Sequence, residues 1–200
     1  MIESIHPQRS DEWFQERLGL PSSSHFGEIV TTQGKPSKQR DKYMYELAGE
    51  RLTGRRMERF VTQKMRGAVE REPQARAFFE LYTGHTVRET GICYINDAKR
   101  FGASPDGLID PDGGLELKDA EPHVQLERLH KGWSKADHFQ QVQGCLWICE
   151  RNWWNLMSYC DGLEPVIIPF ERDEKFISIL AVEVEQFCNE LEQLVARLAA

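Results

Sequence analysis

The chain has 200 residues, 40 % of them hydrophobic, which suffices for one globular domain with a sizeable core. No apolar run approaches the roughly 18 residues of a membrane span and no signal-peptide pattern is present, so we expect a soluble, cytoplasmic protein. The net charge of −7 argues at first against nucleic acid as a partner, because affinity for a phosphate backbone comes largely from Lys and Arg.

The charge is unevenly distributed along the chain. Residues 35–76 hold twelve Lys or Arg against six Asp or Glu, which makes one basic segment in an otherwise acidic protein. This distribution suits a protein that binds nucleic acid in one place and repels it elsewhere. A solvated helical face without any partner accounts for it equally well.

The cysteines are odd in number, scattered, and without a Cys-x-x-Cys pair. We interpret them as reduced core residues rather than as ligands of a metal or cluster. They are Cys93, Cys145, Cys149, Cys160 and Cys188.

Two short helices are predicted near the N-terminus. Ser10 is an N-cap signal for the first, which Gly19 ends shortly after Arg17, and the second runs from Ser24 to about Thr31. Helix ends, hydroxyls and the Arg17 guanidinium meet there, and together they suit a phosphate group. Helix capping alone also explains the serines.

Two longer helices follow. The first ends near Gly54, and the second has Pro73 in its first turn and ends at Gly84. Glu70 and Glu72 would then lie at a helix N-terminus, where the helix dipole favours carboxylates, and this accounts for both without any chemistry. The apolar positions are Met44, Leu47, Ala48 and Leu52 in the first helix, and Ala75, Phe78, Phe79 and Tyr82 in the second.

The centre of the sequence predicts a β-hairpin. Residues 110–114 (DPDGG) are strong turn chemistry, so residues 107–109 and 115–118 are interpreted as two short strands. The second strand, LELK, alternates apolar and charged residues. Because side chains of a strand alternate between faces, Glu116 and Lys118 share the face opposite the two leucines.

Asp106 is delivered to the same face from the start of the first strand. Two converging carboxylates repel each other unless a cation lies between them, and hard divalent ions such as Mg²⁺ prefer oxygen ligands. Such an ion polarises a phosphoryl oxygen and lowers the pKa of bound water, which a nearby lysine orients or deprotonates. A bare Glu-x-Lys is more often an ordinary surface hairpin, but with Pro105-Asp106 at this spacing the pattern favours a metal site with Lys118 beside it.

The remaining elements complete a mixed α/β sheet within a single domain, residues 1–200. Strands are expected over residues 86–95, 153–159 and 166–170, and helices from residue 121, over 136–150 and over 176–198. Gln140, Gln141 and Gln143 lie beside the apolar stripe of the helix over 136–150. They are either a solvated flank or a means of pointing one amide at a substrate.

These motifs resemble the phage lambda exonuclease family of alkaline exonucleases, within the PD-(D/E)xK nuclease superfamily. The resemblance covers most of the chain, and its specific part is the pair Ser104-Pro-Asp-Gly-Leu and Gly114-Leu-Glu-Leu-Lys. Supporting marks are Trp13 with Glu16-Arg17-Leu18-Gly19, Glu72 with Ala75-Arg76, Gln141-Val-Gln143 with Trp147, and Glu171-Arg-Asp-Glu-Lys175.

The resemblance implies an α/β fold with a restriction-endonuclease-like PD-(D/E)xK core, in which helices flank a mixed central sheet. It also implies a 5′→3′ exonuclease on double-stranded DNA that leaves 3′ single strands for recombination in a bacterial host cell. The expected partners are double-stranded DNA, a single-strand annealing protein and two further copies of the chain in a homotrimer ring. The expected cofactor is Mg²⁺, as two ions, with Mn²⁺ able to substitute.

The resemblance further implies roles for individual residues at the catalytic site. Asp106 and Glu116 would be metal ligands, and the backbone carbonyl of Leu117 would complete the inner metal shell. Lys118 would position the nucleophilic water, with Gln141 beside that water.

Two more groups of residues follow from the same resemblance. Glu72 would serve a second metal or its water, with Glu70 as the alternative because of the spacing in this part of the chain. Arg17, Ser24 and Ser104 would hold the terminal 5′-phosphate.

One departure from the family pattern leaves alternatives open. The family usually has Cys-Pro after the lysine, whereas Asp119-Ala120 stands here, and an extra carboxylate there would perturb Lys118 or the metals. A DNA-end-binding recombination scaffold with weak catalysis is therefore one alternative. An endonuclease of the same superfamily is the other, and cleavage of closed circular DNA would distinguish it.

Overall fold

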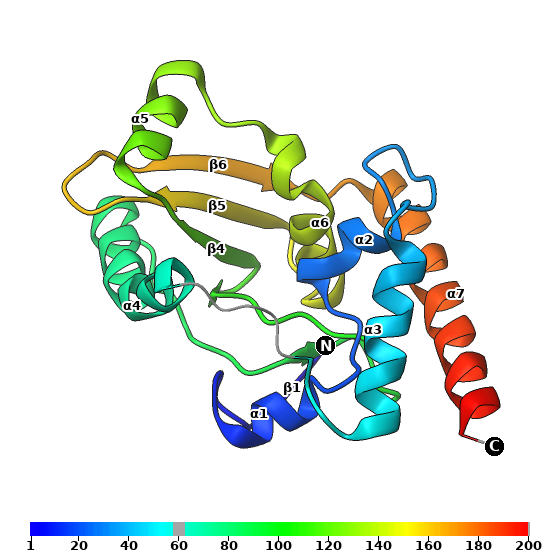
Figure 1. The fold of residues 1–200 in the computed structure, drawn as a ribbon. Coiled ribbons are helices and arrows are strands. Elements are labelled where there is room, and N and C mark those ends of the chain that lie inside the picture. Colours follow the sequence, from blue (N-terminus) through cyan, green and yellow to red (C-terminus); the bar gives the residue numbers. More distant parts are fainter. Residues whose placement is uncertain (58–62, 200) are drawn as a thin grey trace.

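A computed structural model describes residues 1–57 and 63–199. Its centre is a four-stranded sheet in the order β3–β4–β5–β6 (Figure 1). Strands β4 and β5 run parallel and the other neighbours antiparallel, so the sheet is mixed, as the sequence predicts. The strands span Gly107–Ile109 (β3), Gly113–Asp119 (β4), Trp153–Tyr159 (β5) and Val166–Glu171 (β6).

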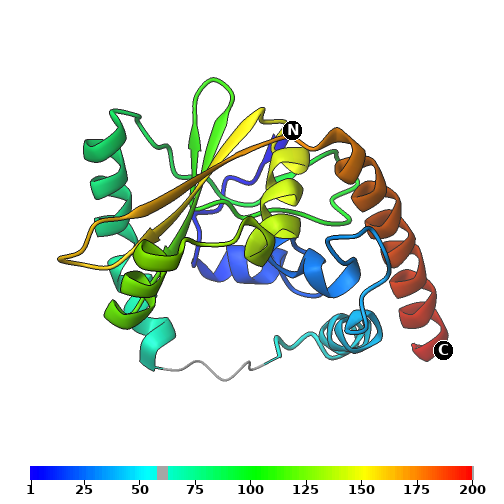
Figure 2. The same ribbon diagram turned by 90° about the horizontal axis from the view of Figure 1, so that it is seen from above.

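Helices cover both faces of this sheet, with α4 on one side and α6 on the other (Figure 2). Ala75 and Phe79 of α4 pack on Leu115 and Met157. The opposite face is buried against a larger core that α2, α3, α6 and α7 share. The helices are α1 (Asp11–Glu16), α2 (Phe26–Ile29), α3 (Arg40–Thr53), α4 (Gln63–Thr83), α5 (Pro122–Lys131), α6 (Phe139–Ile148) and α7 (Glu174–Leu198).

The start predicted for α4 is wrong. The helix begins at Gln63 and carries Pro73 in its interior, so Glu70 and Glu72 lie within it rather than at its N-terminus. An interior proline costs about 3 kcal/mol because it removes one backbone hydrogen bond and crowds the preceding turn. Complete burial of Phe79 against the sheet contributes a similar amount, about 1.5–3 kcal/mol, which offsets that cost.

The N-terminal helices are shorter than predicted. Ser10 does cap α1, because its hydroxyl accepts a hydrogen bond from the Trp13 N–H at 3.1 Å. In place of one helix from Ser24 to Thr31, a 3₁₀ turn over Ser23–His25 leads into α2. The helix predicted over 136–150 is divided in the same way, into a 3₁₀ turn over Lys135–His138 followed by α6.

The strand predicted over residues 86–95 is mostly irregular. Only Cys93–Tyr94 (β2) forms a strand, and it pairs with β1 (Ile2–Glu3) in a separate two-stranded sheet. Gly91 explains this arrangement, because a Cβ there would lie 2.7 Å from the Ser4 carbonyl oxygen. The close approach of the N-terminal segment therefore takes the place of further strand pairing.

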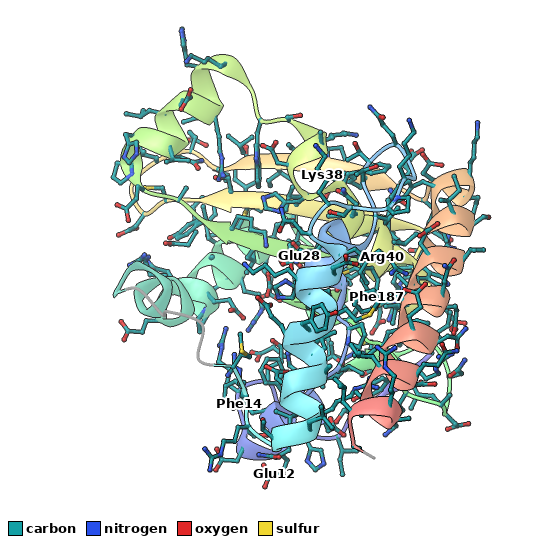
Figure 3. The ribbon with its side chains drawn as sticks, turned by 45° about the vertical axis from the view of Figure 1, so that its right-hand side comes forward. Glu12, Phe14, Glu28, Lys38, Arg40 and Phe187 are labelled. Carbon is teal, nitrogen blue, oxygen red and sulfur yellow. The ribbon has the colours of Figure 1, made fainter. Side chains whose placement is uncertain are left out.

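The C-terminal helix α7 packs along α3, and Arg40 of α3 lies between them (Figure 3). Its guanidinium carbon is 5.2 Å from the centre of the Phe187 ring, and it forms an ion pair with Glu190. The apolar positions that repeat along α7 at helical spacing, from Phe176 to Leu194, are buried, whereas the last one, Leu198, is 56 % exposed.

The cysteines are all buried and free, in agreement with the sequence analysis. None of the described helices is long and apolar enough to cross a membrane. Part of the basic segment at 35–76 lies outside the described residues.

Candidate active site

The hairpin β3–β4 brings Asp106 and Glu116 together. Gly107 pairs with Leu115 across the two strands, so Asp106, one residue before Gly107, stands opposite Glu116. Leu115 and Leu117 point toward α4, whereas Glu116 and Lys118 point toward α6. The alternation read from the sequence thus describes this strand correctly.

Glu116, Lys118 and Gln141 form a closed set of contacts. The Lys118 Nζ donates to Glu116 Oε1 at 2.7 Å and to Gln141 Oε1 at 3.2 Å. The Gln141 Nε2 donates to the same Glu116 oxygen at 2.6 Å. Each side chain therefore fixes the other two, and the lysine ammonium is held beside the carboxylate.

The second oxygen of Glu116 is different. Glu116 is only 4 % exposed, and its Oε2 is buried without a hydrogen-bond partner among the described residues. A buried, unpartnered carboxylate oxygen is costly, because it has lost water without gaining a donor. A bound cation would remove that cost.

Asp106 supplies the second carboxylate. Burial, followed by repulsion from Glu116, raises the pKa of Asp106 well above its usual range, and Glu72 adds to the rise. Two acidic groups that oppose each other's ionisation, one with a vacant buried oxygen, fit a hard divalent ion such as Mg²⁺.

Three hydrogen bonds fix the position of Asp106 and of the residue before it. Its Oδ2 accepts from the Leu117 N–H at 2.6 Å, and its carbonyl accepts from Arg76 Nε at 3.2 Å. The preceding carbonyl, that of Pro105, accepts from Gln8 Nε2 at 2.7 Å. The sequence analysis gave no role to Gln8 or Arg76, because nothing local marks either as a neighbour of Asp106.

The Leu117 carbonyl, which is predicted to bind a metal, can be placed from the backbone geometry. The N–H and C=O of one strand residue point toward the same neighbouring strand. Since the Leu117 N–H bonds Asp106, the Leu117 carbonyl also faces the edge where Asp106 lies.

Glu72 lies near this site but is engaged elsewhere. Its carboxylate accepts from Arg76 Nη2 at 3.0 Å and forms a second ion pair with Arg9. Glu70, the alternative, is exposed. Within the described part of the chain no three His, Cys, Asp or Glu side chains come together as metal ligands, so Glu72 does not join Asp106 and Glu116 as a third.

The lysine carries a positive charge in this arrangement. Burial by itself lowers the pKa of Lys118, but attraction to Glu116 and Asp106 outweighs burial, and the pKa is raised overall. The ammonium form therefore predominates at neutral pH. In that form it donates hydrogen bonds and stabilises negative charge nearby.

A second cluster contains the residues predicted to bind a 5′-phosphate. Arg17 Nη1 donates to Ser104 Oγ at 2.8 Å, which brings together two residues far apart in sequence. Burial lowers the pKa of Arg17, whose guanidinium lies 4.5 Å from the Trp13 ring centre, so an anion would favour its charged form. Ser24 is exposed, and its hydroxyl lies 3.1 Å from that of Ser22.

A small cavity of about 90 Å³ lies beside Arg17. Its polar wall includes two residues for which the sequence analysis had no role, Ser22 and the hydroxyl-bearing Tyr43. Tyr43 also accepts from the Ser22 N–H at 3.3 Å, which ties α3 to the serine turn. The turn serines could have suggested Ser22; no sequence signal pointed to Tyr43.

The expectation that Asp119 perturbs the catalytic residues is wrong. Asp119 follows Lys118 on the strand and therefore points to the other face, toward α4. There both of its oxygens accept from Arg71, at 2.7 and 2.5 Å. The Asp119 carboxylate thus has its own partner. Its presence no longer favours a weakly catalytic scaffold.

The three glutamines of α6 have separate roles. Of the three, Gln141 is the one that contacts Glu116 and Lys118. Gln140 donates to the Val30 carbonyl, and Gln143 bridges the backbone of Glu171 and Asp173. One glutamine is thus directed at the site while two hold the fold.

Comparison with known proteins gives a consistent picture. The family model of the YqaJ-like viral recombinase domain matches residues 12–152. No curated protein sequence matches the chain.

Solved structures match over nearly the full length. An alkaline exonuclease, LHK-Exo, from Laribacter hongkongensis has 32 % sequence identity and a TM-score of 0.84, covering 94 % of this chain and 96 % of that one. Its complex with dAMP matches equally well. A phage-related exonuclease from Haemophilus somnus, at 15 % identity and a TM-score of 0.69, covers 90 % of this chain and 96 % of that one and shares the fold.

Proposed function

The chain belongs to the family of YqaJ-like viral recombinase domains, and on this basis we propose that it is a Mg²⁺-dependent 5′→3′ exonuclease of double-stranded DNA. It would degrade duplexes from 5′-phosphorylated ends and leave 3′ single strands for recombination by strand annealing. The similar LHK-Exo is an alkaline exonuclease, and its complex with dAMP contains a mononucleotide.

One observation carries this proposal. Glu116 is buried directly opposite Asp106, with one oxygen bonded by Lys118 and Gln141 and the other without a partner among the residues that the structure describes. A purely structural ion pair would satisfy both oxygens. The arrangement instead reserves one buried oxygen for a ligand and holds an ammonium beside it.

The residues then have the following roles. Asp106 and Glu116, with the Leu117 carbonyl, would hold Mg²⁺, with two ions in the full site and Mn²⁺ able to substitute. When bound, the metal supplies polarisation of a phosphoryl oxygen and a lower pKa for water. Lys118 and Gln141 orient the attacking water and stabilise developing negative charge through their N–H donors.

Glu72 would position a metal ligand rather than bind the metal itself. It pairs with Arg76, whose Nε holds the backbone carbonyl of Asp106, so it positions a metal ligand through one intermediary. Service to a second ion stays a prediction, and it requires Glu72 to leave Arg9 and Arg76.

The direction of digestion rests on the second cluster. Arg17 and Ser104 would hold the terminal 5′-phosphate, with Ser24 contributing its hydroxyl. Ser104 is two residues before Asp106, so a 5′-phosphate bound there lies close to the metal ligands. We therefore expect the first phosphodiester bond of a duplex end to lie within reach of Lys118.

The partners are part of the same proposal. We expect a homotrimer ring around DNA, a single-strand annealing protein that receives the 3′ strand, and action in the cytoplasm of a bacterial host. Static light scattering tests the first of these, since each chain has a mass of 23.2 kDa. A monomer mass at working concentration would exclude the ring.

The decisive experiment uses linear duplex DNA labelled separately at each 5′ and 3′ end, with and without Mg²⁺. Closed circular DNA and the Lys118→Ala variant are the controls. We expect release of the 5′ label as a mononucleotide, an intact circle and an inactive variant.

Each other result has a definite meaning. Cleavage of the circle would identify an endonuclease of the same superfamily. Tight binding of DNA ends without any cleavage would identify a recombination scaffold. Loss of the 3′ label first would reverse the proposed polarity.

A further inference from the structure

A group of side chains with no assigned role lies beside the catalytic lysine. Ser158 on β5 is paired in register with Lys118 on β4. Paired residues on adjacent strands lie about 4.8 Å apart and point to the same face. Ser158, together with the residues bound to it, therefore continues the catalytic face across the sheet.

Ser158 anchors an arginine from α5. The Arg128 Nη1 donates to Ser158 Oγ at 2.6 Å. The Ser158 hydroxyl in turn donates to Gln125 Oε1, and Gln125 Nε2 donates to the Glu164 carbonyl at 2.6 Å. Gln125 and Ser158 are both fully buried, so this network fixes one end of the Arg128 guanidinium.

An aromatic residue fixes the plane of the guanidinium. The Arg128 Cζ lies 4.0 Å from the Trp133 ring centre, which is a close cation–π stack. Trp133 packs against the main core, and the His138 ring meets it edge-on at 5.5 Å. The arginine is thus held in one orientation by residues that are themselves held.

Arg128 lacks a counter-ion in this rigid setting. Within the described ranges it forms no ion pair, whereas Arg71 and Arg88 each bond a carboxylate through two nitrogens. Asp137 raises the pKa of Arg128 through space, but burial is the larger cause and lowers it. A half-buried cation that is oriented but unneutralised gains from an external anion.

His138 connects this group of side chains to the catalytic residues. This histidine lies one helical turn before Gln141, at the start of α6. Burial, with repulsion from Lys118 and Arg128 only partly offset by Asp137 and Gln141, lowers the pKa of His138 to about 4. The ring is therefore neutral at neutral pH and adds no charge beside Arg128 and Lys118.

We propose that Arg128, stacked on Trp133, binds a backbone phosphate of the DNA strand being degraded, next to the phosphate at Asp106 and Glu116. The guanidinium has five N–H donors in a planar fork, and Ser158 uses one of them. The others suit two-point binding of a phosphodiester. This inference rests on the proposed function and adds a second phosphate site to it.

The test measures equilibrium binding of a 5′-phosphorylated duplex in EDTA, where no cleavage occurs, across a series of salt concentrations. The variants are Arg128→Gln and Arg128→Lys, and Arg197→Gln on the exposed end of α7 is the matched control for loss of one charge. Thermal unfolding of each variant is recorded alongside.

We expect Arg128→Gln to weaken binding about tenfold and to reduce the slope of log Kd against log salt by about one, since one phosphate contact is lost. Arg128→Lys should bind more weakly than wild type but keep the full slope, because the charge remains. Arg197→Gln should change neither quantity.

A structural role for Arg128 gives a different pattern. Both Arg128 variants would then unfold at lower temperature while their salt slopes matched that of the wild type, and this result would overturn the inference. Failure of the proposed function is recognised separately, because it would appear as a wild-type protein that cleaves no DNA end. The binding measurement in EDTA does not depend on cleavage.

Discussion

Replacing Asp106 with Asn should stabilise the metal-free protein. The pKa of Asp106 is raised chiefly by burial and by Glu116, so the ionised carboxylate is less favourable in the folded state than in the unfolded chain. Asn keeps the oxygen that accepts the Leu117 N–H but carries no charge. The site is therefore expected to exchange stability for its capacity to bind an ion.

The size and the pH dependence follow from the direction of this change. Asn removes a charge that faces Glu116 in a half-buried position, so we expect a gain of about 1–2 kcal/mol at pH 8, the order of the penalty for a poorly compensated buried polar group. For a chain of this length that raises Tm by about 3–6 °C. Below the unfolded pKa of about 3.9 both states are protonated and the gain vanishes.

The sign reflects proton binding. As pH rises, the unfolded chain releases its proton first, so wild-type stability falls until the folded state also ionises. Asp106→Asn lacks this fall. Because Asp106 and Glu116 interact strongly, the measured pH dependence belongs to the pair.

The assay is thermal unfolding in EDTA from about pH 4 to pH 9. Asp97→Asn, an exposed residue, is the matched control and should reproduce the wild-type curve. Added Mg²⁺ should raise the wild-type Tm and leave that of Asp106→Asn unchanged. A lower Tm for Asp106→Asn at pH 8, or parallel pH curves for the two proteins, would refute the reasoning.

Four further substitutions test other parts of the structure. Arg17→Ala should slow digestion of 5′-phosphorylated ends more than of 5′-hydroxyl ends, and equal slowing would remove the phosphate assignment. Asp119→Asn breaks an ion pair on the α4 face, so Tm should fall by about 2–4 °C while the nuclease rate stays within twofold; a large loss of rate would place Asp119 in the site after all. Gly144→Ala puts a Cβ 2.6 Å from the Phe26 ring and should cost about 1–3 kcal/mol. At Gly49, in helix α3, an added Cβ would meet no neighbouring side chain or loop within 4 Å, so Gly49→Ala should instead stabilise the fold by about 0.5–1 kcal/mol. Equal effects on stability at the two glycines would contradict the packing described.

The hairpin that carries Glu116 and Lys118 was predictable because its signals are local. Turn residues at 110–114 and alternation along β4 depend on neighbours within a few positions, and these placed Glu116 and Lys118 on one face. The signal for the helix predicted over residues 176–198, its apolar periodicity, was equally local. The start of α4 was not, because burial of Phe79 on the sheet overrides the usual preference of a proline such as Pro73 for the first helical turn.

The supports of the site could not be read from the sequence. Gln8 holds the Pro105 carbonyl across 97 positions, and Arg76 holds that of Asp106 across 30. The choice of Gln141 over two neighbouring glutamines depended on how α6 is rotated against β4, which no periodicity specifies to one residue.

By itself, the sequence determined which segments form helices and strands in most of the chain, and that the carboxylates of the proposed metal site lie on a hairpin, because periodicity and turn chemistry act over short distances. Tertiary structure alone decided what each polar side chain meets. Asp119 pairs with Arg71, Glu72 pairs with two arginines, and Arg128 has no ion pair among the described residues. The physical reason is that a charge is neutralised by whichever group the packing brings within about 4 Å, and such groups come from anywhere in the chain.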